Sequence, residues 1–482
     1  MGEKSLKKNA FYSFLKSFMN IAFPIITFPY VSRILTPESI GRVNFSNSVV
    51  QYFVIIAALG INSYGVREAA KIKNDREALS KFVQELFTIN IISTFISCLL
   101  FVFLLIFSDF LQKYRILLLI CSSKIIFNLI SFDWLYTAEE EFKYITLRSI
   151  FFQIIALVYL FIFVRTDADC IKYAIFGIIS TVGSNIVNFF HARKFVTFKI
   201  RKLNLKIHLK SIFIFFGTTL VISIYSVLDT SMLGFMSTDV EVGFYSVATK
   251  ITNMVTSLLT SVIGILLPRL SFYIKEELVE EYSKLLVKII NVMIVLTVPI
   301  VCGLILLSRQ IIEVFSGAQY VSAVTAMNIM SPVVLLCVFA SISGNILLSQ
   351  NKERVSLIAC IFGAVSNIIL NSIFIPMYGH VGAAFATLIA QFIVMIFQVI
   401  PEWQYFFNKK IFINLISVLI SSFLMSVVVY FLMKNIQNLI LNLLISVFSG
   451  ILVYALFLFI TRNEIFIENV NLLKDKFKRA KK

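Results

Sequence analysis

The chain consists of long apolar runs that recur at short intervals from one end to the other. Each run is about 20 residues or longer, the length of helix that crosses about 30 Å of hydrocarbon. The strands of a transmembrane β-barrel alternate polar and apolar residues over about 10 positions, which these unbroken runs do not. The pattern therefore predicts an all-α polytopic membrane protein of about fourteen transmembrane helices. They are expected at residues 9–35, 38–62, 80–106, 113–137, 142–164, 169–192, 210–236, 240–268, 283–307, 321–349, 354–376, 380–403, 410–434 and 438–461.

Composition excludes several other classes of protein. Hydrophobic residues make up 59% and charged residues 14% of the 482 positions, so no sizeable soluble domain is expected. The basic start, Met1 to Lys8, leads into the first apolar run without a small-residue cleavage site, which predicts a retained first helix. The six cysteines lack paired spacing and matching histidines, so we expect neither a metal site nor a disulfide framework.

Loop charges give the predicted helices a direction, because positively charged loops stay in the cytoplasm. Placing the N-terminus inside puts most Lys and Arg residues on the cytoplasmic side, and both termini are then cytoplasmic. The strongest basic groups lie in residues 67–76, 193–210 and 474–482. The net charge of +17 therefore reflects orientation and contact with anionic lipid, and we expect no nucleic-acid partner.

An internal repeat with a period of about 202 residues divides the chain further. Residues 38–41, at the start of the second predicted helix, resemble residues 241–243 at the start of the eighth, and Arg67 follows the first motif as Arg269 follows the second. Because six helices separate the copies, both halves keep one orientation. We predict an N-terminal six-helix lobe (1–192), a basic cytoplasmic linker (193–209), a C-terminal six-helix lobe (210–403), two additional helices (404–461) and a basic cytoplasmic tail (462–482).

Ionisable side chains inside the apolar runs cost at least about 2.5 kcal/mol each to insert, so they usually face a water-filled cavity or a partner. Most of the cations among them have no obvious acidic neighbour in the sequence. A cationic surplus of this kind favours an anionic substrate, and phosphate or pyrophosphate fits it. The predicted substrate-binding cations are Lys16, Arg42, Lys124 and Lys250.

Small polar residues recur at helical spacing on the first, second and eighth predicted helices. We expect them to line a hydrophilic cleft between the two lobes. For single Ser, Thr and Asn residues, hydrogen bonding between packed helices is the competing interpretation. The predicted lining residues are Asn20, Asn44, Asn47, Gln51, Asn253 and Ser257.

Two acidic residues also lie within apolar runs. Asp133 and Arg148 stand equally far from a predicted turn at residues 139–141, which predicts a structural salt bridge, with gating or coupling as the alternative role. Asp229 lies at about the depth of Lys250. The two residues either form a structural ion pair, or Asp229 is a carboxylate that binds a proton during transport. Coupling to H⁺ or Na⁺ is left open, and no cofactor is expected.

The chain contains no Walker motif, HExxH or serine-triad pattern, which argues against a primary pump and against an enzyme. Three stretches instead have a specific order and spacing: FPYVSRILTP at residues 28–37 with Gly41, FDW at 132–134 followed by KYI at 143–145, and residues 228–246, which run from LD through MLG to VGFYS. Together they resemble the polysaccharide transporters of the MATE-like MOP superfamily, which include the Wzx-type O-antigen flippases. The resemblance covers nearly the whole chain.

This resemblance implies a flippase that moves undecaprenyl-pyrophosphate-linked oligosaccharide units to the outer leaflet by alternating access, for O-antigen, capsule or exopolysaccharide synthesis. The implied partners are the lipid-linked oligosaccharide, membrane lipids, and the polysaccharide polymerase and chain-length machinery. The alternatives are a MATE-type multidrug or cation antiporter, which would have an acidic cavity, and a flippase for the peptidoglycan lipid precursor. A membrane polymerase or acyltransferase would need a large external loop or an acid/base constellation, and neither is visible.

Overall fold

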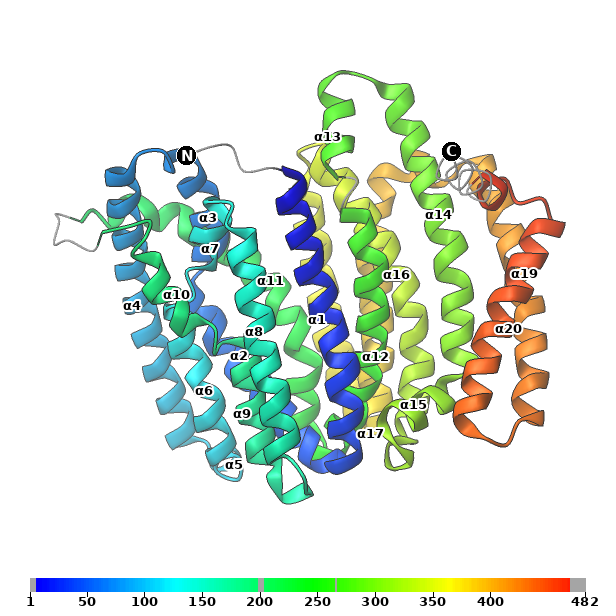
Figure 1. Cartoon of the computed structure of the whole chain (residues 1–482), viewed down its shortest axis with the longest axis horizontal. Coiled ribbons are helices and arrows are strands. Elements are labelled where there is room, and N and C mark those ends of the chain that lie inside the picture. Colours follow the sequence, from blue (N-terminus) through cyan, green and yellow to red (C-terminus); the bar gives the residue numbers. More distant parts are fainter. Residues whose placement is uncertain (1–5, 198–202, 265–266, 469–482) are drawn as a thin grey trace, which may run out of the picture. The chain divides into compact units, whose positions relative to one another are not determined.

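The computed structural model describes residues 6–197, 203–264 and 267–468, and every regular element in these ranges is a helix (Figure 1). The predicted all-α class is therefore confirmed. The first residues of the basic start, part of the predicted linker and the basic tail from residue 469 lie outside the described residues. The chain divides into two compact units, Met1–Gly243 (unit 1) and Phe244–Lys482 (unit 2).

Unit 1 begins with two long helices joined by a capped turn. Thr36 accepts a hydrogen bond from the Ser39 amide at 3.3 Å, and Pro37 occupies the first helical position, where no amide hydrogen is needed. Asp75 caps the start of α4 in the same way. The elements of unit 1 are α1 (Leu6–Ile34), α2 (Pro37–Ala58), α3 (Ile61–Ile72), α4 (Arg76–Phe107), α5 (Asp109–Gln112), α6 (Arg115–Leu129), α7 (Asp133–Ala138), α8 (Phe142–Phe163), the 3₁₀ turn η1 (Asp167–Asp169), α9 (Cys170–Thr181), α10 (Asn185–Ala192) and α11 (Lys206–Met236).

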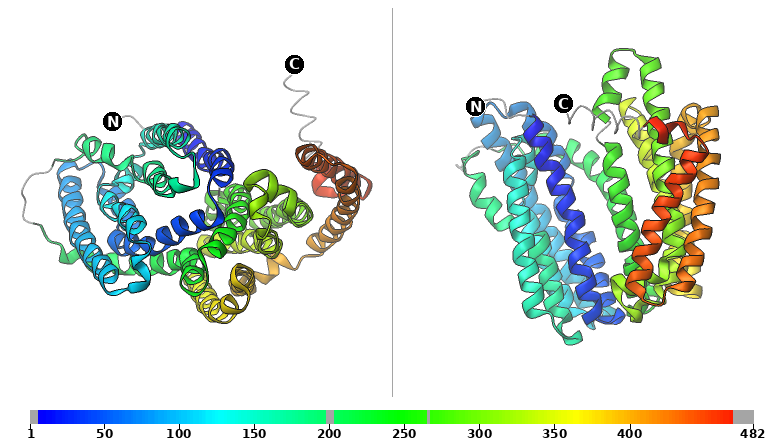
Figure 2. Two further views of the ribbon diagram at one scale, coloured as in Figure 1. Left: turned by 90° about the horizontal axis from the view of Figure 1, so that it is seen from below. Right: turned by 45° about the vertical axis from the view of Figure 1, so that its right-hand side comes forward.

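Unit 2 ends in a helical hairpin, α19 and α20, which lie side by side in both views of Figure 2. Asn408 and Asn438 cap the starts of these two helices with side-chain oxygens. The helix α12 begins in unit 1, and only its first turn belongs there. The elements are α12 (Asp239–Gly264), α13 (Leu267–Lys275), α14 (Val279–Leu306), α15 (Ser308–Ser316), η2 (Ala318–Tyr320), α16 (Ala323–Ser349), α17 (Glu353–Val399), η3 (Ile400–Glu402), α18 (Trp403–Phe406), α19 (Lys409–Asn435) and α20 (Leu439–Ile460).

The described residues contain eleven helices that are long and apolar enough to cross a membrane, or twelve if the bent helix α11 counts as one crossing. The chain is therefore a multi-pass membrane protein, whereas the expected number of fourteen crossings is not confirmed. Two of the expected segments account for the difference. One is the segment at 113–137. The other is the segment at 380–403, which lies in the same long helical element as the segment at 354–376.

The segment at 113–137 is interrupted before it completes a crossing. Its main helix, α6, has 15 residues and spans about 22 Å, short of the roughly 30 Å of hydrocarbon. The chain then leaves the helical conformation, and Phe132 adopts a φ of +48° immediately before α7. The predicted turn that follows is present, because α7 ends at Ala138 and α8 begins at Phe142.

The two later segments form the two arms of α17, which folds back on itself at Gly379. This residue has φ +54° and ψ −131°, a backbone conformation that interrupts the helix and that glycine adopts without steric cost. The arms run antiparallel, since Gln398 donates a hydrogen bond to Ser356 at 2.8 Å and the rings of Phe362 and Phe397 stack at 4.8 Å. One long helical element therefore contains both expected segments.

Helix α4 shows how polar and apolar side chains are distributed. Its serines point inward, where Ser93 donates to the carbonyl of Ala57 at 2.7 Å and Ser97 donates to that of Phe53 at 2.6 Å. Large side chains such as Phe95 and Phe103 are exposed on the same helix. Because a water-facing helix would have the opposite arrangement, this surface is suited to lipid.

The starts of α2 and α12 cross in direct backbone contact within unit 1. A Cβ atom added to Gly41 would lie 1.7 Å from the carbonyl oxygen of Asp239, and one added to Gly243 would lie 2.0 Å from that of Pro37. These are the two glycines that mark the sequence repeat. Only hydrogen atoms in place of side chains allow the helices to approach this closely.

Candidate functional site

Helix α2 holds most of the predicted polar lining of unit 1, and one cation from α6 reaches it. The ammonium group of Lys124 donates a hydrogen bond to Asn47 Oδ1 at 2.6 Å, while the Asn47 amide donates to the Val43 carbonyl at 2.9 Å. Lys124 lies nine residues into α6, about 14 Å along the helix axis, within an apolar segment. The nearest hydrogen-bonding partner of this charge is thus a neutral amide.

The other predicted lining residues of α2 are half-buried. Neither Asn44 nor Gln51 makes a side-chain hydrogen bond with any described residue. Both therefore retain their donors and acceptors close to the Lys124–Asn47 pair. Whether they line a substrate cavity stays a prediction.

A second predicted substrate-binding cation, Lys16, lies on helix α1. It is half-buried and makes no ion pair within the described part of the chain. The predicted lining residue Asn20 is exposed, and its Oδ1 accepts a hydrogen bond from Gln153 Nε2 at 3.0 Å. Thr146 donates to the Tyr12 carbonyl at 2.9 Å, so polar contacts on this face attach α1 to α8.

Arg42 has a different environment from the other three predicted cations. Its Nε lies 3.4 Å from Asp239 Oδ2, and its guanidinium also contacts Glu38. Asp239 is 9% exposed and accepts a further hydrogen bond from the Tyr114 hydroxyl, while Lys113 Nζ lies 3.9 Å away. Two carboxylates therefore balance the charge of Arg42, and its assignment to a cavity remains a prediction. Sequence reasoning did not single out Asp239 or Tyr114, which lie 197 and 72 positions away.

The predicted Asp133–Arg148 ion pair is present, with Arg148 Nη1 2.9 Å from Asp133 Oδ1. A third residue, Asn188 of α10, joins it, because its amide donates to Asp133 Oδ1 at 3.0 Å and its side-chain oxygen contacts Arg148. The hydroxyl of Tyr136 donates to the Asn188 carbonyl. This Asp–Arg–Asn cluster connects α7, α8 and α10. Its role in gating or coupling stays a prediction.

Sequence reasoning missed Asn188, although a signal was present. Asn185, Asn188 and His191 follow one another at three-residue steps and so occupy one face of α10. Asn185 also donates to a backbone carbonyl, that of Phe127, at 3.0 Å. A polar stripe on so short a helix in an apolar segment indicates contact with partners on neighbouring helices.

In unit 2, the predicted residues of α12 occupy one face. Lys250 is half-buried, and Asn253 and Ser257, three and seven positions later, are exposed. Asp229 is half-buried on α11, which belongs to unit 1. The predicted pairing of Asp229 with Lys250 and the predicted cleft between lobes therefore stay predictions.

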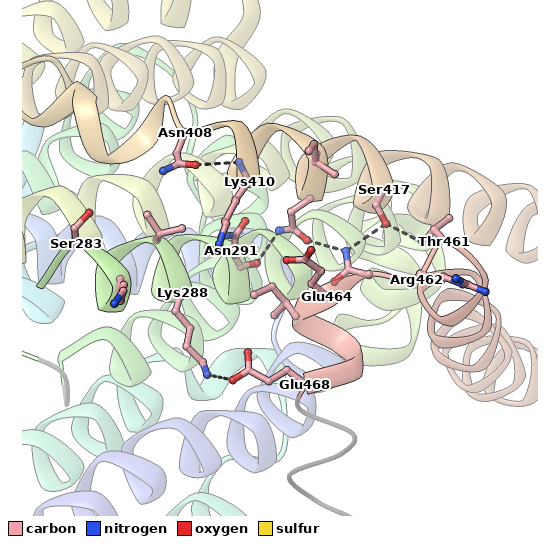
Figure 3. Close-up of a pocket in the computed structure, with 16 residues that line it drawn as sticks. Ser283, Lys288, Asn291, Asn408, Lys410, Ser417, Thr461, Arg462, Glu464 and Glu468 are labelled. Atoms are coloured by element: carbon pink, nitrogen blue, oxygen red, sulfur yellow. Dashed lines mark hydrogen bonds and ion pairs between the residues drawn. The ribbon is translucent and has the colours of Figure 1, made fainter. Parts of the chain in front are cut away.

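A polar pocket that the sequence did not predict lies in unit 2 between α14, α19 and the segment after α20 (Figure 3). Its volume is about 440 Å³. Asn463 donates to Asn414 Oδ1 at 2.7 Å, and the Asn414 amide donates to the Asn291 carbonyl at 3.2 Å. Lys288 and Glu468 form an ion pair at one side. These contacts attach the terminal hairpin to α14.

Acidic, cysteine and histidine side chains do not gather into any group of three or more suited to a metal ion in the described ranges. The charged groups above are therefore arranged around hydrogen bonds and ion pairs. The arrangement places cationic groups and amides inside an apolar helical bundle. Such groups bind anions or hydroxyl-rich molecules.

Comparison with known proteins relates this geometry to two families. Residues 6–274 match the family described as polysaccharide biosynthesis protein, and residues 215–373 match the family named MatE. A proposed O-antigen transporter of Escherichia coli (strain K12) is 25% identical over 81% of this chain and 95% of its own length. The capsular polysaccharide biosynthesis protein CapF of Staphylococcus aureus is 22% identical over 84% of this chain and 100% of its own length.

Solved structures share the fold. The lipid II flippase MurJ in an inward closed conformation superposes with a TM-score of 0.74 at 21% identity, covering 95% of this chain and 99% of that one. A multidrug resistance MATE transporter of the MOP superfamily, in an inward-facing conformation, gives a TM-score of 0.59 at 16% identity over 81% of this chain and 94% of its own. At these identities, the similarity concerns the fold alone.

Proposed function

Since the chain belongs to the family of polysaccharide biosynthesis proteins, we propose that it is a flippase for lipid-linked oligosaccharides. Its substrate is an undecaprenyl-pyrophosphate-linked repeat unit, which it moves from the cytoplasmic to the outer leaflet of a bacterial inner membrane. The unit then serves the synthesis of O-antigen, capsule or exopolysaccharide. Similarity over more than 80% of the chain to proteins named for O-antigen transport and capsule synthesis supports this proposal.

The observation that carries the proposal is the Lys124–Asn47 pair. An ammonium group within an apolar membrane segment costs at least about 2.5 kcal/mol, and a neutral amide at 2.6 Å leaves its charge uncompensated. A pyrophosphate that reaches Lys124 during transport would supply the missing negative charge. Lys16 on α1 and Lys250 on α12 are the further cations that we assign to the path of the head group, with Arg42 at its outer end.

We propose the following topology for this transport. The chain crosses the membrane fourteen times, with α6–α7 as one crossing and the two arms of α17 as two, and both termini are cytoplasmic. Residues 1–192 and 210–403 form the two lobes that alternate in access, joined by the linker 193–209 and followed by the hairpin 404–461 and the tail 462–482. Polysaccharide polymerase and chain-length proteins are the partners that would receive the flipped unit.

A second candidate is a multidrug or cation antiporter, which the match of residues 215–373 to the MatE family favours. Such a carrier needs carboxylates in its cavity to bind a cationic substrate. The predicted cavity residues of unit 1 instead include three cations, and two of them, Lys16 and Lys124, pair with no described carboxylate. A flippase for the peptidoglycan lipid precursor is a further alternative, because the fold is similar to that of MurJ. It would use the same cations and differ in the sugar that it accepts.

The test is reconstitution of the purified chain into liposomes with a fluorescent undecaprenyl-pyrophosphate oligosaccharide, scoring the leaflet that holds the sugar. Lys124→Ala removes a charged hydrogen-bond donor worth about 1.5–3 kcal/mol, so transport should slow by about 10- to 100-fold. Lys124→Arg keeps the charge and should retain much more activity. Lys81→Ala, at an exposed lysine of α4, is the matched control and should transport like the wild-type protein.

Each result separates the candidates. No sugar movement above that of protein-free liposomes would overturn the flippase proposal. Proton-driven uptake of ethidium in the same liposomes would instead support the antiporter. Transport of the peptidoglycan precursor in preference to the oligosaccharide lipid would replace the proposed substrate while retaining flipping.

A further inference from the structure

A second cationic feature lies away from the Lys124–Asn47 pair, at the start of α8. An open pocket of about 760 Å³ is formed there by α8, α10 and the turn before α8. By the positive-inside pattern, this end of unit 1 faces the cytoplasm. The pocket is lined by charged and aromatic groups at one end and by apolar side chains at the other.

The charged end has a cationic surplus. Lys143 and Lys194 are exposed at the rim, and neither forms an ion pair with a residue that the structure describes. Arg148 forms the floor, with its carboxylate partner Asp133 behind it. Glu141 is the single acidic residue among those that line the pocket, so an anion entering it meets a net positive charge.

The floor also contains a buried donor without an acceptor. The side chain of Arg148 is 5% exposed, and its Nε has no hydrogen-bond partner, while its Nη1 binds Asp133 and Asn188. Beside it, His191 stacks on the Tyr144 ring at 3.7 Å, and the Nδ1 of His191 is unpartnered too. A buried N–H without an acceptor is costly, so this position favours an occupant with an acceptor oxygen.

The other end of the pocket follows α8 away from the charged rim. Lys143, Leu147 and Phe151 stand at successive four-residue steps, so they lie on one helix face and extend over about 12 Å. Leu147, Phe151 and the facing Val187 are all exposed, which leaves an uncovered apolar wall directly beyond the cations. The pocket therefore complements an amphiphile with an anionic head and a hydrocarbon tail.

We propose that this pocket is a resting site in the cytoplasmic leaflet for the pyrophosphate head of an isoprenoid-linked lipid. The pyrophosphate lies between Lys143 and Lys194 and accepts a hydrogen bond from Arg148 Nε. The first isoprene units lie along Leu147, Phe151 and Val187. This assignment rests on the proposed flippase function and adds to it a loading step outside the transport path. The adjoining pocket of Lys8, Phe11, Tyr12 and Lys143 extends the positive surface toward α1.

A free phosphate compound is a weaker fit, because it would leave the apolar wall exposed. The test uses farnesyl pyrophosphate as the probe, with the full chain purified in a neutral detergent and binding measured by titration calorimetry. Farnesol, inorganic pyrophosphate and phosphatidylglycerol are the comparison ligands. Farnesyl pyrophosphate should bind at least tenfold more tightly than each of them. Equal binding of inorganic pyrophosphate would overturn a lipid site, and equal binding of phosphatidylglycerol would overturn the isoprenoid assignment.

Variants test whether the probe binds in this pocket. The double variant Lys143→Ala/Lys194→Ala, called the rim variant below, changes exposed side chains only and should weaken farnesyl pyrophosphate binding at least tenfold. The double variant Lys81→Ala/Lys210→Ala removes two exposed lysines from the same predicted side of unit 1 and should bind like the wild-type protein. Arg148→Lys keeps the charge beside Asp133 but loses Nε, and it should weaken binding as well. If the rim variant binds the probe normally, the pocket is not the site.

A transport assay separates failure of this site from failure of the flippase function. In the liposome assay, the rim variant should raise the KM for the lipid-linked oligosaccharide at least tenfold with kcat nearly unchanged, because the head group is loaded there but carried elsewhere. If the wild-type protein transports the lipid and the rim variant has an unchanged KM, the resting site is overturned and the proposed function is left intact. Absence of transport by the wild-type protein would overturn both.

Discussion

Replacing Gly41 or Gly243 by alanine should destabilise unit 1, because the two residues bring the starts of α2 and α12 into backbone contact. The new Cβ atoms would lie 1.7 Å and 2.0 Å from carbonyl oxygens of the opposite helix, where at least about 3 Å is needed. The helices must therefore separate by about 1 Å or more. Overpacking of this kind costs about 1–3 kcal/mol. The separation also lengthens the 3.4 Å Arg42–Asp239 contact, which adds at most about 1 kcal/mol.

The two tryptophans of the chain make this measurable in one unit. Trp134 is buried in unit 1, and Trp403 is exposed in unit 2, so the variant Trp403→Phe leaves a fluorescence signal from unit 1 alone. Thermal unfolding in detergent should give a Tm lower by about 2–4 °C for each kcal/mol lost. Gly217→Ala is the control, since nothing lies within 4 Å of its new Cβ and alanine favours the helix.

The double variant Gly41→Ala/Gly243→Ala sharpens the test. Both substitutions force the same separation of the same two helices, so their combined cost should be smaller than the sum of the single costs. Single variants that melt with the Gly217→Ala control would refute the backbone contact. Fully additive losses would refute the inference that one shared crossing is responsible.

Three further substitutions follow from contacts within single units. Gly379→Ala places a Cβ on a residue with φ +54° and ψ −131° and should cost about 1–3 kcal/mol, read from the melting of unit 2 through Trp403; an unchanged Tm would contradict the turn in α17. Asp133→Ala leaves the buried guanidinium of Arg148 without its carboxylate and should cost about 1–3 kcal/mol in unfolding free energy, a value discounted because Asp133 is 38% exposed. A double-mutant cycle with Arg148→Met that shows no coupling energy would contradict the ion pair. Tyr114→Phe removes a donor to a buried carboxylate and should cost about 1.5–3 kcal/mol in unit 1 melts, whereas wild-type stability would argue against that hydrogen bond.

The sequence was most informative where interactions are local. Hydrophobic runs located the long helices, because lipid requires about 20 apolar residues in succession whatever the fold. The Asp133–Arg148 pair was predictable because both residues flank one short turn, which fixes their relative depth. The reversal at Gly379 lies in the gap between the predicted helices 354–376 and 380–403. The interruption at Phe132 was not predicted, since it depends on backbone dihedrals that hydropathy does not report.

Contacts between distant helices were beyond the sequence. Arg42 looked unbalanced because its carboxylate partner Asp239 stands 197 positions away, on a helix whose neighbour is set by tertiary packing. The two glycines that mark the repeat meet in the structure, a contact that the repeat itself did not predict. Lys124 was recognised as a candidate, but its neutral partner Asn47 emerged only from the packing of α6 on α2.

The turn of α17 at Gly379 has a consequence for how the protein is made. Its two arms are joined without a loop, and Gly382 packs so closely on Phe374 that an added Cβ would lie 2.2 Å from its carbonyl oxygen. Because the hydrocarbon core offers no hydrogen-bond partners to irregular backbone, the reversal at Gly379 cannot rest there exposed to lipid. We therefore expect the two arms to enter the bilayer together as a pair.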